Sequence, residues 1–203
     1  MHSRTKDAEL IEQTIEFHGH WCPGLAIGIR AAKWALEELG KSPDEEIVAV
    51  VETDMCGVDA IQCLVGCTFG KGNLIHRDYG KNAFTFYRRR DGKAARLVTR
   101  ENFKGEAGRK LSHLNRKRRE EGLTEAEEKQ VEEARQEVSR WILDLPLAEL
   151  FHFKEPADPP PQKARIMASH MCEVCGEQAM ETRIRRFDEK FLCIPCFEAV
   201  EKR

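Results

Sequence analysis

The sequence has no run of about 18 apolar residues, so it predicts no transmembrane helix. Its first ten residues are charged and lack the apolar core of a secretory signal, and we therefore expect a cytoplasmic protein. The formal net charge of −2 argues against a surface that is basic throughout. The sequence also lacks a ferredoxin-type C-x2-C-x2-C-x3-C run, a pterin-binding motif and a Walker A phosphate loop.

Eight cysteines in 203 residues are too few for a disulfide scaffold. In a reducing compartment they indicate metal or redox chemistry instead. They form two groups, separated by a Pro-rich stretch over residues 156–165 that favours an extended spacer. We therefore predict a domain over residues 1–155 and a small module over residues 166–203.

The C-terminal group has the C-x2-C and C-x2-C spacing of a structural zinc site, formed by Cys172, Cys175, Cys193 and Cys196. Four thiolates close a tetrahedral shell, so this zinc would fold the module and would not catalyse a reaction. A hairpin turning at Asp188-Glu189 and a ligand-bearing helix over residues 195–201, which the second cysteine pair opens, predict a treble-clef-like or zinc-ribbon-like finger.

Hydrophobic periodicity predicts an α+β class for the first domain, a mixed α/β unit with a helical insertion. We expect helices over 6–18, 23–39 and 57–64, and strands over 47–53, 72–76, 83–88 and 94–99. The insertion is the charged segment 104–143, with helices over 106–121 and 125–143. Its basic run, Arg116 to Arg119, either contacts phosphate or forms a solvated helix face.

The first domain concentrates metal-ligating and nucleophilic side chains just before two predicted helices. His18, His20 and Cys22 precede the helix over 23–39, and Pro23 suits its first turn, which leaves Cys22 as the N-cap. Cys56 begins the helix over 57–64. A helix N-terminus favours a thiolate, which suits either a metal ligand or a nucleophile.

Other residues near these positions leave alternatives open. Cys67 lies too far along a straight helix to share a metal with Cys56. Either the chain turns at Gly66, or the two thiols serve separate sites, or Cys67 meets a second copy of the chain. We interpret Cys63 as a packing residue. Lys71 either binds an anion or is a solvated loop lysine.

Three segments together resemble the FmdE-like family, which is named after a component of formylmethanofuran dehydrogenase. The matching residues are Phe17-His18-Gly19-His20-x-Cys22-Pro23-Gly24 with Gly28, Cys56-x2-Asp59-Ala60-Ile61-Gln62, and Gly66-Cys67-Thr68-x-Gly70-Lys71-Gly72-Asn73-Leu74. The C-terminal finger resembles the zinc module that some members carry. The resemblance implies α+β domains in an intertwined homodimer with a metal-binding cleft, and an association with a molybdenum or tungsten enzyme.

Three functions follow from these patterns. The first is a metal-binding protein, either a metal-dependent enzyme or an accessory protein, whose candidate N-terminal ligands are His18, His20, Cys22, Cys56 and Cys67. Mixed nitrogen and sulfur ligands suit zinc first, then iron, nickel or copper. The second is thiol chemistry without metal, and the third is a regulatory module that binds nucleic acid or protein. The candidate catalytic residues are Cys22, Cys56, Asp59 and Lys71.

Overall fold

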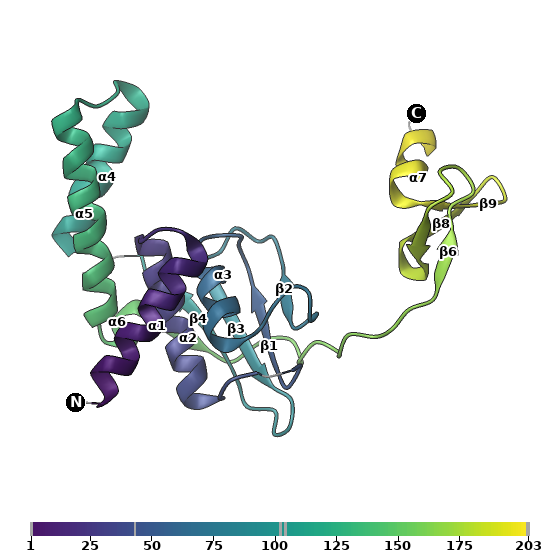
Figure 1. Ribbon diagram of the computed structural model, residues 1–203, viewed down its shortest axis with the longest axis horizontal. Coiled ribbons are helices and arrows are strands. Elements are labelled where there is room, and N and C mark those ends of the chain that lie inside the picture. Colours follow the sequence, from purple (N-terminus) through teal and green to yellow (C-terminus); the bar gives the residue numbers. More distant parts are fainter. Residues whose placement is uncertain (1, 43, 102, 104, 202–203) are drawn as a thin grey trace. The chain divides into compact units, whose positions relative to one another are not determined.

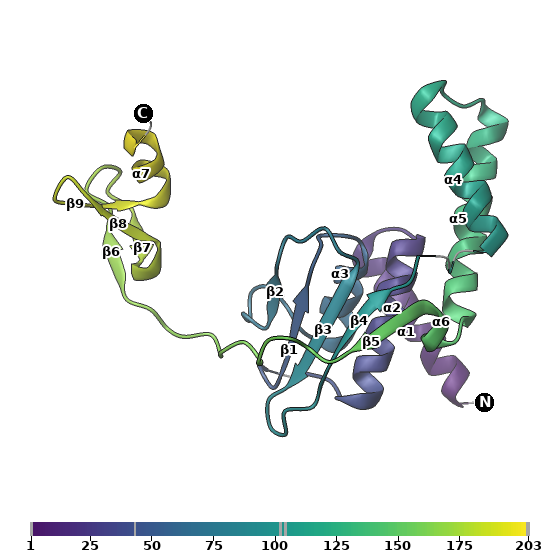
Figure 2. The same cartoon turned by 180° about the vertical axis from the view of Figure 1, so that it is seen from behind.

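The computed structural model is built on a five-stranded mixed sheet. Its strands are β1 (Ile47–Val51), β2 (Leu74–His76), β3 (Ala83–Arg88), β4 (Ala94–Thr99) and β5 (Phe151–Lys154). They lie in the order β2-β1-β3-β4-β5 (Figure 2), with β1 and β2 parallel and the other pairs antiparallel. The structure describes residues 2–42, 44–101, 103 and 105–201.

Helices cover one face of this sheet (Figure 1). They are α1 (His2–His18), α2 (Pro23–Glu38) and α3 (Gly57–Ala60), which continues as the π-helical turn η1 (Ile61–Val65). The apolar stripe of α2, including Leu25 and Ile29, is buried in one core with Phe84 and Phe86 of β3. All three helices were predicted from the sequence, because their apolar residues recur at helical spacing.

The charged insertion is a helical hairpin of α4 (Gly105–Glu120) and α5 (Glu125–Asp144) (Figure 1). Thr124 and Glu127 form a capping box at the start of α5. At its other end, the Arg30 guanidinium of α2 donates to the carbonyls of Leu143 at 2.6 Å and Leu145 at 2.5 Å. These bonds satisfy backbone acceptors at the helix end and fasten the hairpin to the core.

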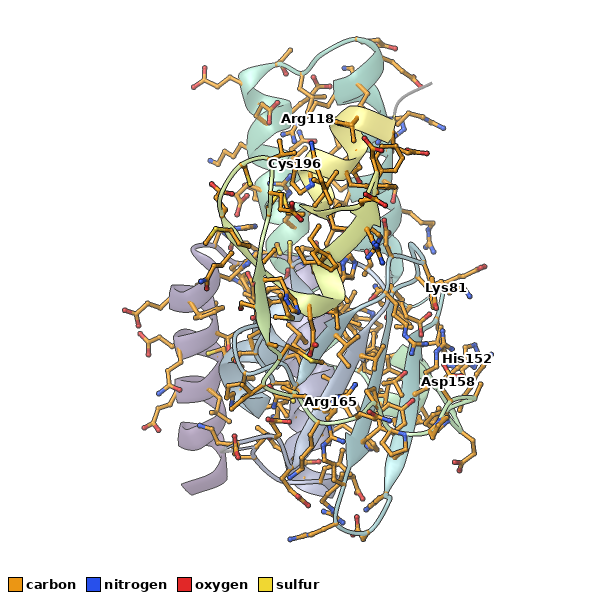
Figure 3. All side chains as sticks on the ribbon, turned by 90° about the vertical axis from the view of Figure 1, so that its right-hand side faces the viewer. Lys81, Arg118, His152, Asp158, Arg165 and Cys196 are labelled. Carbon is orange, nitrogen blue, oxygen red and sulfur yellow. The ribbon has the colours of Figure 1, made fainter. Side chains whose placement is uncertain are left out.

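The sequence predicts an extended spacer after β5, and the structure shows that the first part of this segment is hydrogen-bonded to the sheet. After the short helix α6 (Leu147–Leu150) and β5, the chain crosses the uncovered face of the sheet (Figure 2). We call residues 155–161 the strap. Tyr87 Oη donates to the Asp158 carbonyl at 3.2 Å, and Arg89 Nη1 donates to the Pro161 carbonyl at 2.5 Å. Figure 3 shows Asp158 and Lys81 at one edge of the unit, where both line a cavity of about 330 Å³.

A buried ion pair joins β4 to the end of β1 beneath the strap. Arg96 donates to both carboxylate oxygens of Glu52, at 2.6 and 2.7 Å, and Glu52 is 5% exposed. The Arg96 hydrogen bonds hold the pKa of the Glu52 carboxyl below its ordinary value of 4.5.

We expect Glu52→Gln to lower the free energy of unfolding at pH 7 by about 2 kcal/mol, because it leaves a largely buried guanidinium unpaired. The depressed folded pKa means that the pair stabilises the native state above pH 4.5, and that this contribution is lost as the pH falls through the folded value. The difference between wild type and variant should therefore shrink on acidification. Urea unfolding at several pH values measures it. Glu38→Gln, which breaks the exposed Lys93 pair, is the control and should change the free energy of unfolding far less, because water and salt screen an exposed pair.

The chain divides into two compact units, residues 1–163 and 164–203. The second unit contains β6 (Ser169–Met171), β7 (Gln178–Met180), η2 (Glu181–Arg183), β8 (Ile184–Phe187), β9 (Lys190–Cys193) and α7 (Ile194–Glu201). The predicted fold class, a mixed α/β domain with a C-terminal finger, is confirmed. The predicted limits at residues 1, 104 and 203 lie outside the described residues. None of the described helices has the length and apolar character needed to span a membrane.

Candidate metal centre

Cys22 is the N-cap of α2, as the sequence predicts. Its backbone is extended, Pro23 occupies the first turn, and its Sγ accepts a hydrogen bond from the Leu25 amide at 3.4 Å. The thiol is thereby held at the N-terminal end of the helix, where the helix dipole favours negative charge.

Cys56, at the start of α3, lies close to Cys22. The two helices approach closely because Gly28 has no side chain: a Cβ there would lie 2.2 Å from the Gly57 carbonyl oxygen and 2.4 Å from the Gly57 Cα. Burial raises the pKa of the Cys56 thiol, and the neighbouring Cys22 raises it further. The Cys56 thiol is therefore harder to ionise than a free cysteine unless a cation lies beside it.

Two histidines complete a four-residue group. One ligand atom from each of His18, His20, Cys22 and Cys56 lies within 4.8 Å of all the others. His18 Nε2 is 4.0 Å from Cys22 Sγ, and a tetrahedral zinc shell would set these atoms about 3.6 Å apart. The donor set and spacing therefore fit a transition-metal ion after a small contraction. We call these four residues the His/Cys cluster.

Asp59 orients one of these imidazoles. Its Oδ2 lies 2.7 Å from His18 Nδ1, so His18 presents Nε2 to the cluster. Gln62 Nε2 donates to the other Asp59 oxygen at 3.4 Å. A carboxylate on the far nitrogen of a metal-binding histidine fixes the tautomer and raises the basicity of the ligand. Asp59, a candidate catalytic residue from the sequence, thus lies behind His18 as a positioning residue.

Replacing Asp59 with Asn should weaken metal binding at the His/Cys cluster by roughly tenfold to a hundredfold, because the His18 ring loses its charged partner. Competition with a chromophoric chelator measures the change. The exposed Asp78, which lies outside this network, provides the control variant Asp78→Asn. Equal affinities in wild type and Asp59→Asn would contradict the positioning role.

The structure places Cys67 and Lys71 away from the cluster. Cys67 is fully buried, its Sγ donates to the Ile47 carbonyl at 3.4 Å, and burial raises its pKa to about 12. Lys71 Nζ donates to the Ser42 carbonyl at 3.3 Å. The helix ends at Gly66, whose φ of 81° turns the chain, and this removes Cys67 from the face that carries Cys56. Both side chains support the loop after η1.

A cavity of about 420 Å³ adjoins the cluster and is lined by His18, Val51, Thr53, Asp54, Met55, Cys56, Val58, Asp59, Gln62, Phe69, Leu74 and His76. Two of the four candidate ligands, His18 and Cys56, form part of its wall. No sequence pattern indicated this cavity, because Leu74 and His76 come from β2, far from His18 in the sequence.

The C-terminal cysteines converge on a second centre. Their four Sγ atoms also lie within 4.8 Å of one another, and Cys175 and Cys193 are 3.8 Å apart, close to the edge of a Zn–S4 tetrahedron. Backbone N–H donors, that of Cys175 first, lower the pKa of the Cys172 thiol to about 6. Gly176, with a φ of 74°, closes the knuckle by donating to the Cys172 carbonyl at 2.9 Å.

The rest of the finger follows the predicted plan. β8 and β9 pair around Asp188 and Glu189, which both adopt positive φ as a tight hairpin turn requires. α7 carries Cys196. The additional pair β6 and β7 was not expected from the sequence, because its three-residue strands are too short for a periodic signal.

Fold and cysteine geometry together define a class: an α+β domain with a His/Cys cluster, joined to a four-cysteine zinc finger. Residues 17–152 match the family model described as FmdE, molybdenum formylmethanofuran dehydrogenase operon. The chain belongs to the FmdE family. Residues 165–202 match the prokaryotic dksA/traR C4-type zinc finger, and Cys172, Cys175, Cys193 and Cys196 form its zinc site.

A solved structure and a curated relative are similar over nearly the whole chain. The structure is a tungsten formylmethanofuran dehydrogenase FmdE-like protein from Syntrophus aciditrophicus, with a TM-score of 0.62, 23% identity, and coverage of 97% of this chain and 95% of the other. At that identity it supports the fold. A probable S-adenosyl-L-methionine-binding protein of Archaeoglobus fulgidus is 36% identical over 202 residues, which cover 95% of this chain and 54% of the relative. The chain therefore spans about half the length of that relative.

Proposed function

We propose that the FmdE domain binds one transition-metal ion, zinc in the first place, through His18, His20, Cys22 and Cys56. The observation that carries the proposal is the Asp59–His18 hydrogen bond of 2.7 Å, which leaves Nε2 directed at the Cys22 thiol, with Cys56 in the same group. Mixed imidazole and thiolate ligands suit zinc, and then iron, nickel or copper. Such an ion supplies Lewis-acid chemistry to a molecule bound beside it.

The residues around the cluster have separable tasks. Cys22 and Cys56 supply negative charge from two helix starts, His18 supplies a nitrogen held by Asp59, and His20 is exposed. Four protein ligands would close a tetrahedral zinc shell, but release of the exposed His20 would leave three protein ligands and the open position of a catalytic site. We therefore favour a metal-dependent enzyme over an accessory protein that only stores or delivers the ion.

Two other functions receive less support from the described residues. The metal-free alternative takes Cys22 as its nucleophile with His18 or His20 as the base, and Cys56 does not suit that role because burial raises its pKa. Two of the four residues of the basic run of α4 are engaged inside the hairpin, where Lys117 lies 2.5 Å from Glu127 and Arg118 pairs with Glu128. This favours the solvated helix face over a phosphate contact.

Elemental analysis of untagged, full-length protein tests the metal proposal. We expect about two metal ions per chain in the wild type and about one in Cys22→Ser or Cys56→Ser, because each substitution removes a thiolate ligand. Cys63→Ser is the matched control: its thiol lies 3.9 Å from the Gln13 carbonyl, outside the cluster, and the protein should keep two ions. Unchanged metal content in both cluster variants would refute the proposal.

The proposal extends to assembly. The family resemblance favours a homodimer and an association with a molybdenum or tungsten enzyme. Light scattering coupled to gel filtration separates a 23.3 kDa monomer from a dimer.

A further inference from the structure

We propose that the cavity beside the His/Cys cluster binds a small uncharged nitrogen-donor molecule with an apolar body, and discriminates against anions. This inference rests on the proposed metal site and names the class of ligand that would reach it. It depends on where the cavity leads, what its walls are made of, and which charges face it.

The cavity connects the cluster to the surface. His18 and Cys56 line one side, while Asp54, Phe69 and His76 are exposed and form its mouth. Phe69 is 80% exposed, which is unusual for a large aromatic ring. A molecule that enters at this mouth therefore reaches the ligand atoms of His18 and Cys56, and exchange of His20 or a fifth ligand position admits its donor atom.

The deeper walls are apolar. Val51 and Leu74 are buried, and Met55 and Val58 are half-buried side chains packed against the same core. Such walls favour a ligand that carries hydrocarbon or aromatic surface, at roughly 25 cal/mol for each Å² removed from water. The volume of about 420 Å³ lies within the range of small-molecule sites.

The charges that face the cavity are negative. Asp54 and Asp59 line it, and among the described lining residues there is no Lys or Arg. A divalent ion held by two thiolates is neutral in sum, so these carboxylates leave the site with net negative charge. An anion would be repelled by them, whereas a neutral nitrogen base, whose lone pair is free to bind the ion, would not.

The probes are imidazole, 4-phenylimidazole and acetate, applied to full-length protein loaded with cobalt(II) at pH 8. The same protein with Cys22→Ser and Cys56→Ser supplies the blank, so the difference spectrum reports the cluster and not the finger. We expect imidazole to change the cobalt difference spectrum, 4-phenylimidazole to bind at least about tenfold more tightly because of the apolar wall, and acetate to bind at least about tenfold more weakly than imidazole.

Asp54→Asn tests the charge directly, since Asp54 lines the cavity and is not a member of the cluster. The variant should bind acetate roughly threefold to tenfold more tightly and leave imidazole affinity nearly unchanged. Asp78→Asn, which does not line the cavity, should change neither. Acetate binding as tight as imidazole binding in the wild type, or equal acetate affinities in wild type and Asp54→Asn, would overturn the charge argument.

The remaining outcomes separate this inference from the metal proposal. A thiolate-to-cobalt band in the difference spectrum that no probe alters would leave the metal site intact and refute the cavity ligand. Equal affinities for imidazole and 4-phenylimidazole would refute the apolar body. Absence of any band in the difference spectrum would refute the metal proposal itself, and this inference would fall with it.

Discussion

Replacing Gly28 with alanine should destabilise the FmdE domain strongly, because α2 and α3 pack against each other at this position. The new Cβ would lie 2.2 to 2.6 Å from three backbone atoms of Gly57, and backbone cannot rotate away as a flexible side chain can. Overpacking costs about 3 kcal/mol, and alanine returns about 1 kcal/mol through its helix propensity. We therefore expect a net loss of about 2 kcal/mol and a fall in Tm of roughly 5 °C.

The same substitution should also reduce metal binding at the His/Cys cluster. Gly28 sets the distance between α2 and α3, and the helix starts that carry Cys22 and Cys56 must move apart if Gly57 is displaced. Gly70→Ala is the matched control, because nothing lies within 4 Å of a Cβ at that position. Thermal unfolding and metal content that match the wild type in Gly28→Ala would show that the close approach is not needed.

Removing zinc from the finger should unfold residues 164–203 while the first unit stays folded. Among the described residues of this unit, the buried apolar cluster consists of Cys172, Leu192 and Cys193, supported by three partly buried neighbours. Such a core cannot offset the conformational entropy of about forty residues, so the four zinc–sulfur bonds hold the fold.

Two-dimensional NMR of the full-length protein measures this effect. Backbone amide signals of β8, β9 and α7 should collapse to random-coil positions after chelation, and they should return when stoichiometric zinc is added. Cys175→Ser should reproduce the collapse without chelator. Dispersed finger signals in protein shown to be free of metal would contradict the prediction, and simultaneous loss of the β3 and β4 signals would mean that the two units are not independent.

Local sequence patterns predicted the elements that carry their own periodicity and caps. The hairpin of β3 and β4 was placed at its observed bounds, because alternating residues flank Asp91-Gly92, and α5 was placed by its capping box. β5 was missed, since its four residues follow a long insertion and pair with a strand far away in the sequence. The contacts of the strap depend on Tyr87 and Arg89 across the sheet, and no local pattern reports such contacts.

The types of ligand at the candidate site could be predicted from the sequence, whereas the set of residues that form the site could be predicted only in part. His18, His20, Cys22 and Cys56 were candidates because thiols and imidazoles preceded two helices. Cys67 was included for its residue type and for its place in the family motif, and the structure shows that the chain turns at Gly66 and buries it in the core. The role of Asp59 in orienting His18 depends on a contact between residues that are 41 positions apart.

The pairing of β5 with β4 fixes the order in which the first unit can be completed as the chain leaves the ribosome. β1, β2, β3 and β4 lie close together in sequence and can pair early, but the outer edge of β4 remains open until the whole α4–α5 hairpin and β5 have been made. The strap closes later still, when Asp158 and Pro161 emerge. Non-local closure of this kind slows folding and leaves a β edge exposed in the nascent chain. A nascent chain stalled before residue 151 should therefore have β1 and β3 paired, while the outer edge of β4 remains unpaired and prone to aggregation.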